Sequence, residues 1–244
     1  FVQNGGVLGA ADDSDHRRQR RVLQDGFRPA AIASLAPRVE EIGRQMWSQH
    51  FSTDGEGDFV RLFAFPFPAD VIAEMLGVKA EDRDRFGEWS DDIVNGLGGG
   101  DLRLVERANQ GIYSIVDELV ADRRRLIENG QEPPDDLTTV LTRAHLAGEL
   151  GYDEVRQLAQ QVLVAGHETT ASLIGLMLYR LATEPSLMEA LRADPDLVPM
   201  AVEEFLRFDS PVQGLFRTNK QSCPLGDHQL GERTKVQLLF AAAN

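Results

Sequence analysis

Through most of the chain, apolar residues recur three and four positions apart, and short clusters of turn-forming residues separate these stretches. This spacing places the apolar side chains on one face of a helix. The chain is therefore expected to be mainly α, with a small β part at its end. Helices are predicted near 14–25, 29–52, 68–77, 80–96, 101–129, 136–146, 152–183, 185–192 and 195–208. Branched and aromatic residues at 212–218 and 235–240 predict two strands, and turn-forming glycines lie between them.

The longest predicted helix, 152–183, has an unusual segment in its middle. Residues 165–170 read AGHETT. Gly166 costs about 1 kcal/mol relative to alanine in a helix interior, and Thr169 can bond back to a carbonyl one turn earlier. A ligand that approaches the backbone closely would explain this choice of residues. Close packing of another helix against Gly166 would explain it equally well.

Two common motifs, a zinc site at 167–171 and a nucleotide-binding loop at 96–101, are each started but not completed in this chain. His167 and Glu168 begin like the zinc-protease pattern H-E-x-x-H, but Ala171 stands at the position of the second histidine. The remaining histidines are not at ligand spacing, so no mononuclear zinc site is predicted. The glycines at 96–100 miss the G-x-G-x-x-G pattern, because Asp101 stands where its last glycine would be.

Composition excludes several classes of partner. The chain has 25 basic and 39 acidic residues and a formal net charge of -14. This charge opposes binding to nucleic acid and to an anionic membrane surface. The single cysteine, Cys223, has no partner for a disulfide within the chain, which favours a reducing compartment and a cytoplasmic location. No apolar run looks long enough to cross a bilayer, so no membrane association is expected.

Three motifs follow one another in the second half of the chain. After AGHETT at 165–170 come Glu204 and Arg207, three apart on one helical face, and then SPVQGLFRT at 210–218. Taken alone, Glu204 and Arg207 would be a common surface ion pair. In this order, the three motifs closely resemble the central-helix, E-x-x-R and haem-edge strand motifs of the cytochrome P-450 family. The resemblance implies that Glu204 and Arg207 hold the core of that fold together.

The N-terminal part agrees with this resemblance. Residues 15–21 read DHRRQRR and are followed by FRP at 27–29, which is similar to the H-x-x-x-R helix of the family and the turn after it. The resemblance implies that His16, Arg20 and Arg217 bond the haem propionates, because charge-assisted bonds to carboxylates are strong. From the residues alone, a solvated basic helix face remains the alternative.

The resemblance also implies roles for the central helix. Thr169 would hold the hydrogen-bond network of bound oxygen, and Glu168 would relay protons to it from solvent. Ala165 and Gly166 would leave room for oxygen and substrate beside the cofactor. Segments 1–10 and 89–104, together with Val164, are expected to line the substrate pocket.

The activity implied is that of a monooxygenase that inserts one oxygen atom of O2 into a small hydrophobic organic substrate. Its cofactor would be heme b, iron protoporphyrin IX, with electrons from NAD(P)H delivered through a ferredoxin-type donor. In the family, a cysteine thiolate in a glycine-rich loop beyond the E-x-x-R helix binds the iron.

We expect residues 1–244 to form a partial domain of this family, truncated at both ends, without the N-terminal β region and without the cysteine loop. Cys223 lies where the family has a β turn, so no metal ligand is expected in this chain, and the chain alone is expected to be inactive. A catalytically dead remnant and a helical small-ligand-binding module without redox chemistry are the alternatives.

Overall fold

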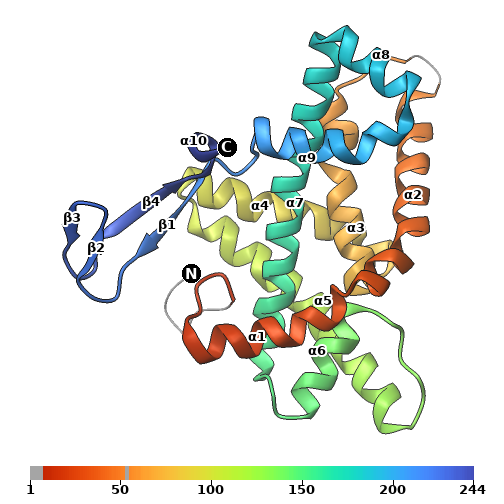
Figure 1. The fold of residues 1–244 in the computed structure, drawn as a ribbon. Helices are drawn as coiled ribbons and strands as arrows, with labels where there is room; N and C mark the ends of the chain where they lie inside the picture. The colour runs from red at the N-terminus through yellow and green to blue at the C-terminus, as the bar shows by residue number, and fades with distance from the viewer. Residues whose placement is uncertain (1–7, 53–54) are drawn as a thin grey trace. The chain divides into compact units, whose positions relative to one another are not determined.

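The computed structural model describes residues 8–52 and 55–244, apart from the side chains of Val94, Leu97 and Gly98. The chain divides into two compact units, Phe1–Ala171 and Ser172–Asn244. The helix α7, Tyr152–Thr183, runs through the boundary between them (Figure 1). Helices make up most of both units, and the strands are confined to the second, which confirms the predicted mainly α class.

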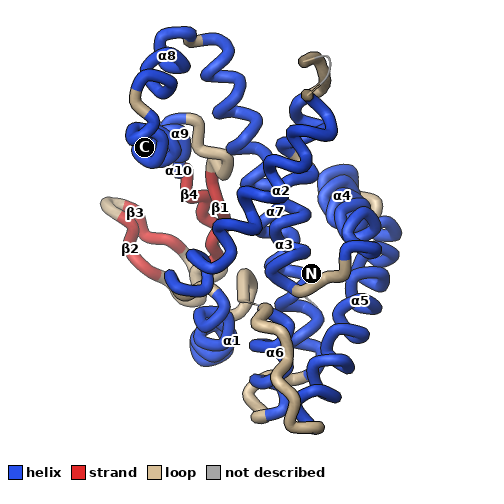
Figure 2. The backbone as a smooth tube through the Cα atoms, turned by 90° about the vertical axis from the view of Figure 1, so that its right-hand side faces the viewer, coloured by secondary structure: helices blue, strands red, loops and turns tan. Residues whose placement is uncertain are grey.

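Among the described residues of the first unit, all regular secondary structure is helical. Its elements are α1 (Asp13–Gly26), α2 (Pro29–Phe51), the π-helix η1 (Val60–Ala64), α3 (Pro66–Leu76), the short 3-10 helix η2 (Ala80–Asp82), α4 (Arg83–Gly99), α5 (Leu102–Glu128), α6 (Leu137–Leu146) and α7 as far as Ala171. Helices α4 and α5 lie side by side as an antiparallel pair, and α6 lies near one end of α5 (Figures 1 and 2).

Local chemistry sets several helix ends in this unit. Gly77 ends α3 in the left-handed region at φ 73°, which favours glycine. The carboxylate of Asp101 accepts from Arg103 N at 3.1 Å at the start of α5. That of Asp136 accepts from Thr139 N at 2.7 Å at the start of α6.

The core of the first unit forms where α5 and the first half of α7 turn their apolar stripes inward. Both stripes keep helical spacing, and beside them Arg156 and Gln160 of α7 donate to Asp117 and Asn109 of α5. The fully enclosed residues include Phe86 and Ile93 of α4, Ile112 of α5, Leu141 of α6, and Val155, Leu158 and Leu163 of α7.

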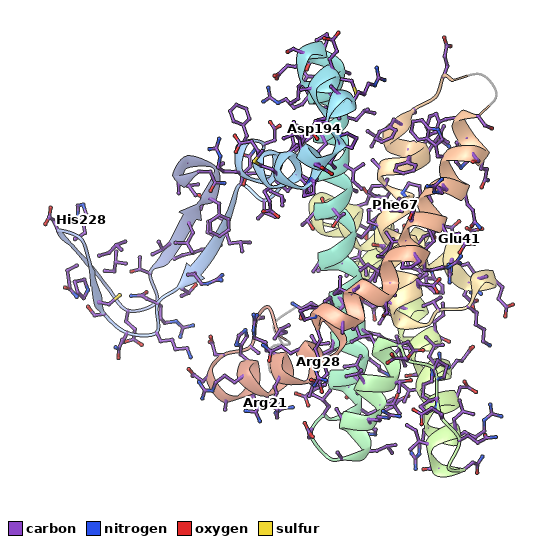
Figure 3. The ribbon with its side chains drawn as sticks, turned by 45° about the vertical axis from the view of Figure 1, so that its right-hand side comes forward. Arg21, Arg28, Glu41, Phe67, Asp194 and His228 are labelled. Atoms are coloured by element: carbon purple, nitrogen blue, oxygen red, sulfur yellow. The ribbon has the colours of Figure 1, made fainter. Side chains whose placement is uncertain are left out.

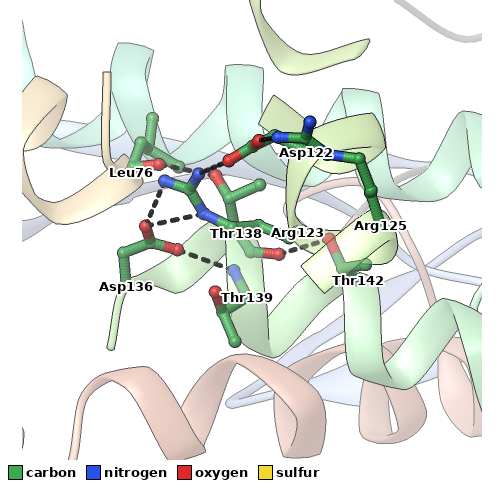
Figure 4. Close-up of polar contacts among 8 residues, drawn as sticks. All are labelled: Leu76, Asp122, Arg123, Arg125, Asp136, Thr138, Thr139 and Thr142. Carbon is green, nitrogen blue, oxygen red and sulfur yellow. Dashed lines mark hydrogen bonds and ion pairs between the residues drawn. The ribbon is translucent and has the colours of Figure 1, made fainter. Parts of the chain in front are cut away.

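A buried ion pair joins α5 to the start of α6 (Figure 4). Arg123 donates to Asp136 Oδ2 from Nη2 at 2.7 Å and from Nε at 3.1 Å, and both side chains are less than a tenth exposed. Nearby, the Thr138 hydroxyl donates to the Leu76 carbonyl at 2.6 Å, at the end of α3. These bonds link α3, α5 and α6 at one place. The ion pair contributes to stability only while both of its charges are present.

The second unit contains the rest of α7, then α8 (Pro185–Ala193), the short 3-10 helix η3 (Pro195–Leu197), α9 (Val198–Phe208), β1 (Gly214–Thr218), β2 (Cys223–Leu225), β3 (His228–Leu230), β4 (Lys235–Leu239) and α10 (Phe240–Ala243). Strand β1 pairs antiparallel with β4, and β2 pairs antiparallel with β3. Arg180 of α7 forms a two-pronged bond to Asp209 at the end of α9, with a shortest distance of 2.8 Å.

Every predicted helix is present, and most of the predicted helix ends lie within two residues of the observed ones. Both predicted strands are present as β1 and β4. The predicted β turn at Cys223 was wrong, because Cys223 pairs with Leu230 as the first residue of β2. The hairpin β2–β3 and the helices η1 and α10 were missed. Strands of three residues and helices of four or five contain too few positions to show their period.

One expectation about membranes needs correction. Within the described residues, α7 is long and apolar enough by length and composition to span a membrane. Val155, Leu158 and Leu163 of the same helix are fully buried in the first unit, but only 17% of its most apolar 18-residue window is buried. One such helix by itself is weak evidence of a membrane span.

We expect Arg123→Leu to lower the free energy of unfolding by about 3 to 5 kcal/mol, because it leaves the Asp136 carboxylate buried without its counter-charge. The matched control is Arg124→Leu, which breaks an exposed pair with Glu128 and should cost about 1 kcal/mol or less. Urea unfolding of the two variants measures both values, and equal losses would refute the importance assigned to the buried pair.

Candidate functional site

The middle of α7 has two chemically different sides. At about 100° of rotation per residue, Ala165, Glu168 and Thr169 share one side of the helix. Ala165 and Glu168 are exposed and Thr169 is half-buried. His167 lies on the other side and is 1% exposed. We call the first group the front face of α7: it presents a small side chain, a carboxylate and a hydroxyl.

The hydroxyl of Thr169 is bonded to the backbone. Its Oγ1 donates to the Ala165 carbonyl at 2.8 Å, one turn earlier, as the sequence predicted. The hydroxyl hydrogen is therefore engaged, while the oxygen can still accept a hydrogen bond from a ligand.

Gly166 packs closely against α3. A Cβ atom at this position would lie 2.6 Å from Ile72 Cδ1 and 3.0 Å from its Cγ1. This contact supports the helix-packing explanation of the glycine. The expected place of Gly166 beside a cofactor stays a prediction.

Helix α1 is attached to the first turn of α7 by one edge. Arg18 donates to the two carboxylate oxygens of Glu154 at 2.7 and 3.1 Å, and to the Glu149 carbonyl at 2.7 Å. Gln19 also donates to Glu154, at 2.9 Å. The hydrogen bonds from Arg18 are the main cause that lowers the pKa of Glu154 to about 2. The carboxylate is thus charged over the whole neutral range, and it fixes how α1 crosses α7.

His16 and Arg20 lie beside this attached edge, four positions apart on one face of α1. Over residues 8–52 and 55–244, neither the His16 imidazole nor the Arg20 guanidinium has a hydrogen-bond or ion-pair partner. The predicted pairing of the two on one helical face is confirmed. The His16 imidazole and the Arg20 guanidinium can both donate to an anion, and no carboxylate of the described residues bonds either of them.

The first unit also fixes how far these two places are apart along α7. From Glu154, where α1 attaches, to Ala165 the helix rises about 16 Å. The N-terminal segment approaches between them: a Cβ atom on Gly9 would lie 2.3 Å from Gln161 Nε2, one turn before Ala165. One small ion therefore cannot touch both ends of this stretch of α7.

The other predicted site residues belong to the second unit. Arg217 lies on β1, is exposed, and donates to the Phe216 carbonyl at 3.0 Å. Glu204 and Arg207 form a two-pronged ion pair at 2.6 and 2.8 Å on α9, which confirms that they share a face. Arg207 lowers the pKa of Glu204 through these bonds. Arg207 also donates to the Asn244 carbonyl at 2.7 Å.

A separate polar cavity of about 470 Å³ lies among α2, η1, α3 and α4, and His167 forms part of its wall. Burial raises the pKa of Asp91 in this wall to about 6 and also raises the pKa of Asp70. None of the front-face residues lines this cavity. Sequence reasoning missed its acidic wall and the role of His167, which it weighed only as a metal ligand. A histidine within an otherwise apolar helix was the available signal.

The residues fit a haem group in part. His16 and Arg20 fit propionates, and the exposed Ala165 leaves space on the front face of α7. The donor set for an iron is poorer, since Cys223 is the only cysteine of the chain and lies half-buried in β2. Within the described residues, no group of three or more histidine, cysteine, aspartate or glutamate side chains could hold a metal ion.

Comparisons with known proteins agree on one family. The family model described as Cytochrome P450 matches residues 1–244. The chain is 35% identical to "Cytochrome P450 107B1" of Saccharopolyspora erythraea over 235 residues, which are 96% of this chain and 56% of that protein. It is 36% identical to "Vitamin D(3) 25-hydroxylase" of Pseudonocardia autotrophica over 237 residues, again 96% and 56%. The chain thus spans about half the length of these curated relatives.

Solved structures give the same result. The structure of Cytochrome P450 CYP109Q5 from Chondromyces apiculatus matches with a TM-score of 0.84 and 35% identity, over 97% of this chain and 58% of that one. The crystal structure of CalO2 matches with a TM-score of 0.89 and 29% identity, over 97% and 59%.

The Glu154 bond predicts a pH dependence of stability. Because the folded-state pKa of Glu154 is lowered from 4.5 to about 2, its contribution is present above pH 4.5 and is lost as pH falls towards 2. Glu154→Gln should therefore lower stability at neutral pH and flatten the decrease in acid. Urea midpoints between pH 7 and pH 3 measure this. Glu40→Gln, in the exposed pair with Arg44, is the control, and a parallel decrease in all three proteins would contradict the assignment.

Proposed function

Because the chain belongs to the cytochrome P450 family, we propose that it forms part of a haem-dependent monooxygenase that acts on a small organic substrate. We further propose that residues 1–244 are part of one domain of that enzyme. The observation that most directly supports the activity is the front face of α7, where an exposed carboxylate and a hydroxyl stand beside a small residue. The same unit contains His16 and Arg20, which have no partner among the described residues.

In this proposal, His16, Arg20 and Arg217 bind the haem propionates. Each is a cation or a donor of hydrogen bonds, and bonds of this kind to carboxylates are about twice as strong as neutral ones. Ala165 would leave space beside the cofactor, with Gly166 next to it. The haem would supply the activation of O2 that inserts one oxygen atom into a substrate C–H bond. Cys223 is not proposed as the thiolate that would bind its iron.

Glu168 and Thr169 handle protons on the front face. The Glu168 carboxyl is exposed, so it can exchange protons with solvent. Thr169 Oγ1 can accept a hydrogen bond while its own hydrogen stays on the Ala165 carbonyl. An acid next to a hydroxyl on one helical face makes a short path from solvent to the cofactor.

The substrate and the partners follow from chemistry and from relatives. Similar proteins include "6-deoxyerythronolide B hydroxylase", and one matched structure shows P450BioI with a fatty acid linked to acyl carrier protein. We propose a small hydrophobic substrate, O2, and electrons from NAD(P)H through a ferredoxin-type donor. Arg17 and Arg21 of α1 are exposed cations without partners among the described residues, which favours an acidic donor protein; Arg21 is labelled in Figure 3. The proposed location is the cytoplasm.

The test is a carbon monoxide difference spectrum of the product of the complete reading frame that encodes this chain. The red-shifted band of a thiolate-bound haem is expected there. The 244-residue chain alone, given haem and reductant, should not show it. Absence of haem from the complete product would favour a remnant or a ligand-binding module, and the thiolate band in the chain alone would show that Cys223 binds the iron.

We expect Thr169→Ala to separate electron use from product formation, because a hydrogen-bond acceptor on the front face of α7 is lost. Product per electron should decrease at least about tenfold, the scale expected for a positioned proton-transfer group, and hydrogen peroxide should rise. The matched control is Thr170→Ala, which removes an exposed hydroxyl next to it on another side of α7. If both variants remain coupled, Thr169 does not have the assigned role.

A further inference from the structure

We propose that His167 is a positioning residue for Glu168 and Thr169. This proposal rests on the function proposed above. The His167 imidazole attaches the side of α7 opposite the front face to α4 and to the start of α3. The front face is thereby kept in one orientation.

The imidazole is enclosed and fully bonded. Its Nδ1 lies 2.6 Å from Ser90 Oγ on α4, and its Nε2 lies 2.8 Å from the Phe65 carbonyl at the start of α3. A carbonyl only accepts, so Nε2 bears the hydrogen and Nδ1 accepts from the Ser90 hydroxyl. Burial lowers the pKa of His167, which keeps the ring neutral and this pattern of bonds intact.

Apart from the side that forms the wall of the polar cavity, the ring is held by buried or bonded neighbours. Ser90 is fully buried. The Phe65 ring lies against the imidazole with 4.4 Å between centroids, and Phe65 N donates to the Val60 carbonyl across η1. Together with the contact of Gly166 on Ile72, these bonds hold α7 against α3 and α4 at one point of its length.

This point is where the front face needs support. His167 is directly followed by Glu168 and lies two residues before Thr169, about 200° around the helix from it. A rotation of α7 that moved the Thr169 hydroxyl would have to break both bonds of the imidazole. Each break would leave a buried polar group without a partner, which costs about 1–3 kcal/mol.

The same bonds connect the front face with α4. Ser90 follows Trp89, and segment 89–104 was expected to line the substrate pocket. Trp89 packs so closely on α5 that a Cβ atom on Gly111 would lie 2.3 Å from its ring. A displacement of α4 by substrate would therefore act on α7 through Ser90 and His167.

The first test is local hydrogen–deuterium exchange of the amides of 165–170. His167→Phe keeps a ring and removes both bonds, so exchange there should become about tenfold faster. His167→Gln keeps one donor and one acceptor and should stay near the unsubstituted protein. The matched control is His145→Phe, because His145 also bonds a carbonyl, that of Leu150 at 2.9 Å, away from this segment. Equal exchange in all of these proteins would overturn the proposal.

The second test separates positioning from stability. In the complete enzyme, His167→Phe should reduce product per electron while electron use continues, and His167→Gln should restore the product. In a Thr169→Ala background, His167→Phe should cause no further loss of coupling. A loss of the same size in both backgrounds would show that His167 does not act through Thr169.

Two outcomes keep this proposal distinct from the proposed function. The exchange test needs no haem, so it can by itself support or overturn the claim that the two bonds of the His167 imidazole hold residues 165–170 in place. If exchange of 165–170 is faster in His167→Phe but the unsubstituted enzyme makes no product, the proposed function fails and the positioning role fails with it. Should His167→Phe not fold, Ser90→Ala removes one of the two bonds and is expected to give a smaller change in the same direction.

Discussion

The structure depends on one constraint: the helix α7 has to bury one side in the core and expose polar residues on the other side. The first half resolves this with fully buried side chains such as Leu158 and Leu163. At 165–170 the apolar stripe ends, and the neutral imidazole of His167 takes over the attachment to the neighbouring helices. Gly166 lets α3 approach. The side that faces away is then free to present Ala165, a carboxylate and a hydroxyl.

An ion pair determines where His16 and Arg20, the part of the candidate site on α1, lie. In a chain with a net charge of -14, a surface cation readily finds a carboxylate. Arg18 does so with Glu154 and attaches α1 to α7. His16 and Arg20 lie beside that attachment and have no partner in the described residues, so they can bind an anion from outside the chain. The same acid–base pair that orients α1 therefore also decides where these two donors point.

The sequence predicted the long elements because helical spacing repeats over ten or more residues and turn-forming clusters separate the stretches. It also indicated that a threonine of 165–170 can bond back one helical turn, as Thr169 does. The anchor at His167 could not be predicted, since Ser90 and Phe65 are 77 and 102 residues away along the chain. The short strands β2 and β3 were missed for lack of a period. Gly166 fitted two explanations, and its contact with Ile72 supports the packing explanation. The roles assigned to Glu168, Arg217 and the pair Glu204–Arg207 remain proposals drawn from the family.

The central claim is that one face of α1 holds the carboxylates of the cofactor. It is tested most directly by a haem titration of the product of the complete reading frame, followed by absorbance, with Arg20→Gln beside Arg21→Gln. Both arginines are exposed neighbours on α1, but only Arg20 shares a face with His16. The account predicts that Arg20→Gln weakens haem binding by about tenfold or more, the loss of one charge-assisted bond, and that Arg21→Gln leaves it unchanged. Equal affinities in the two variants would contradict it.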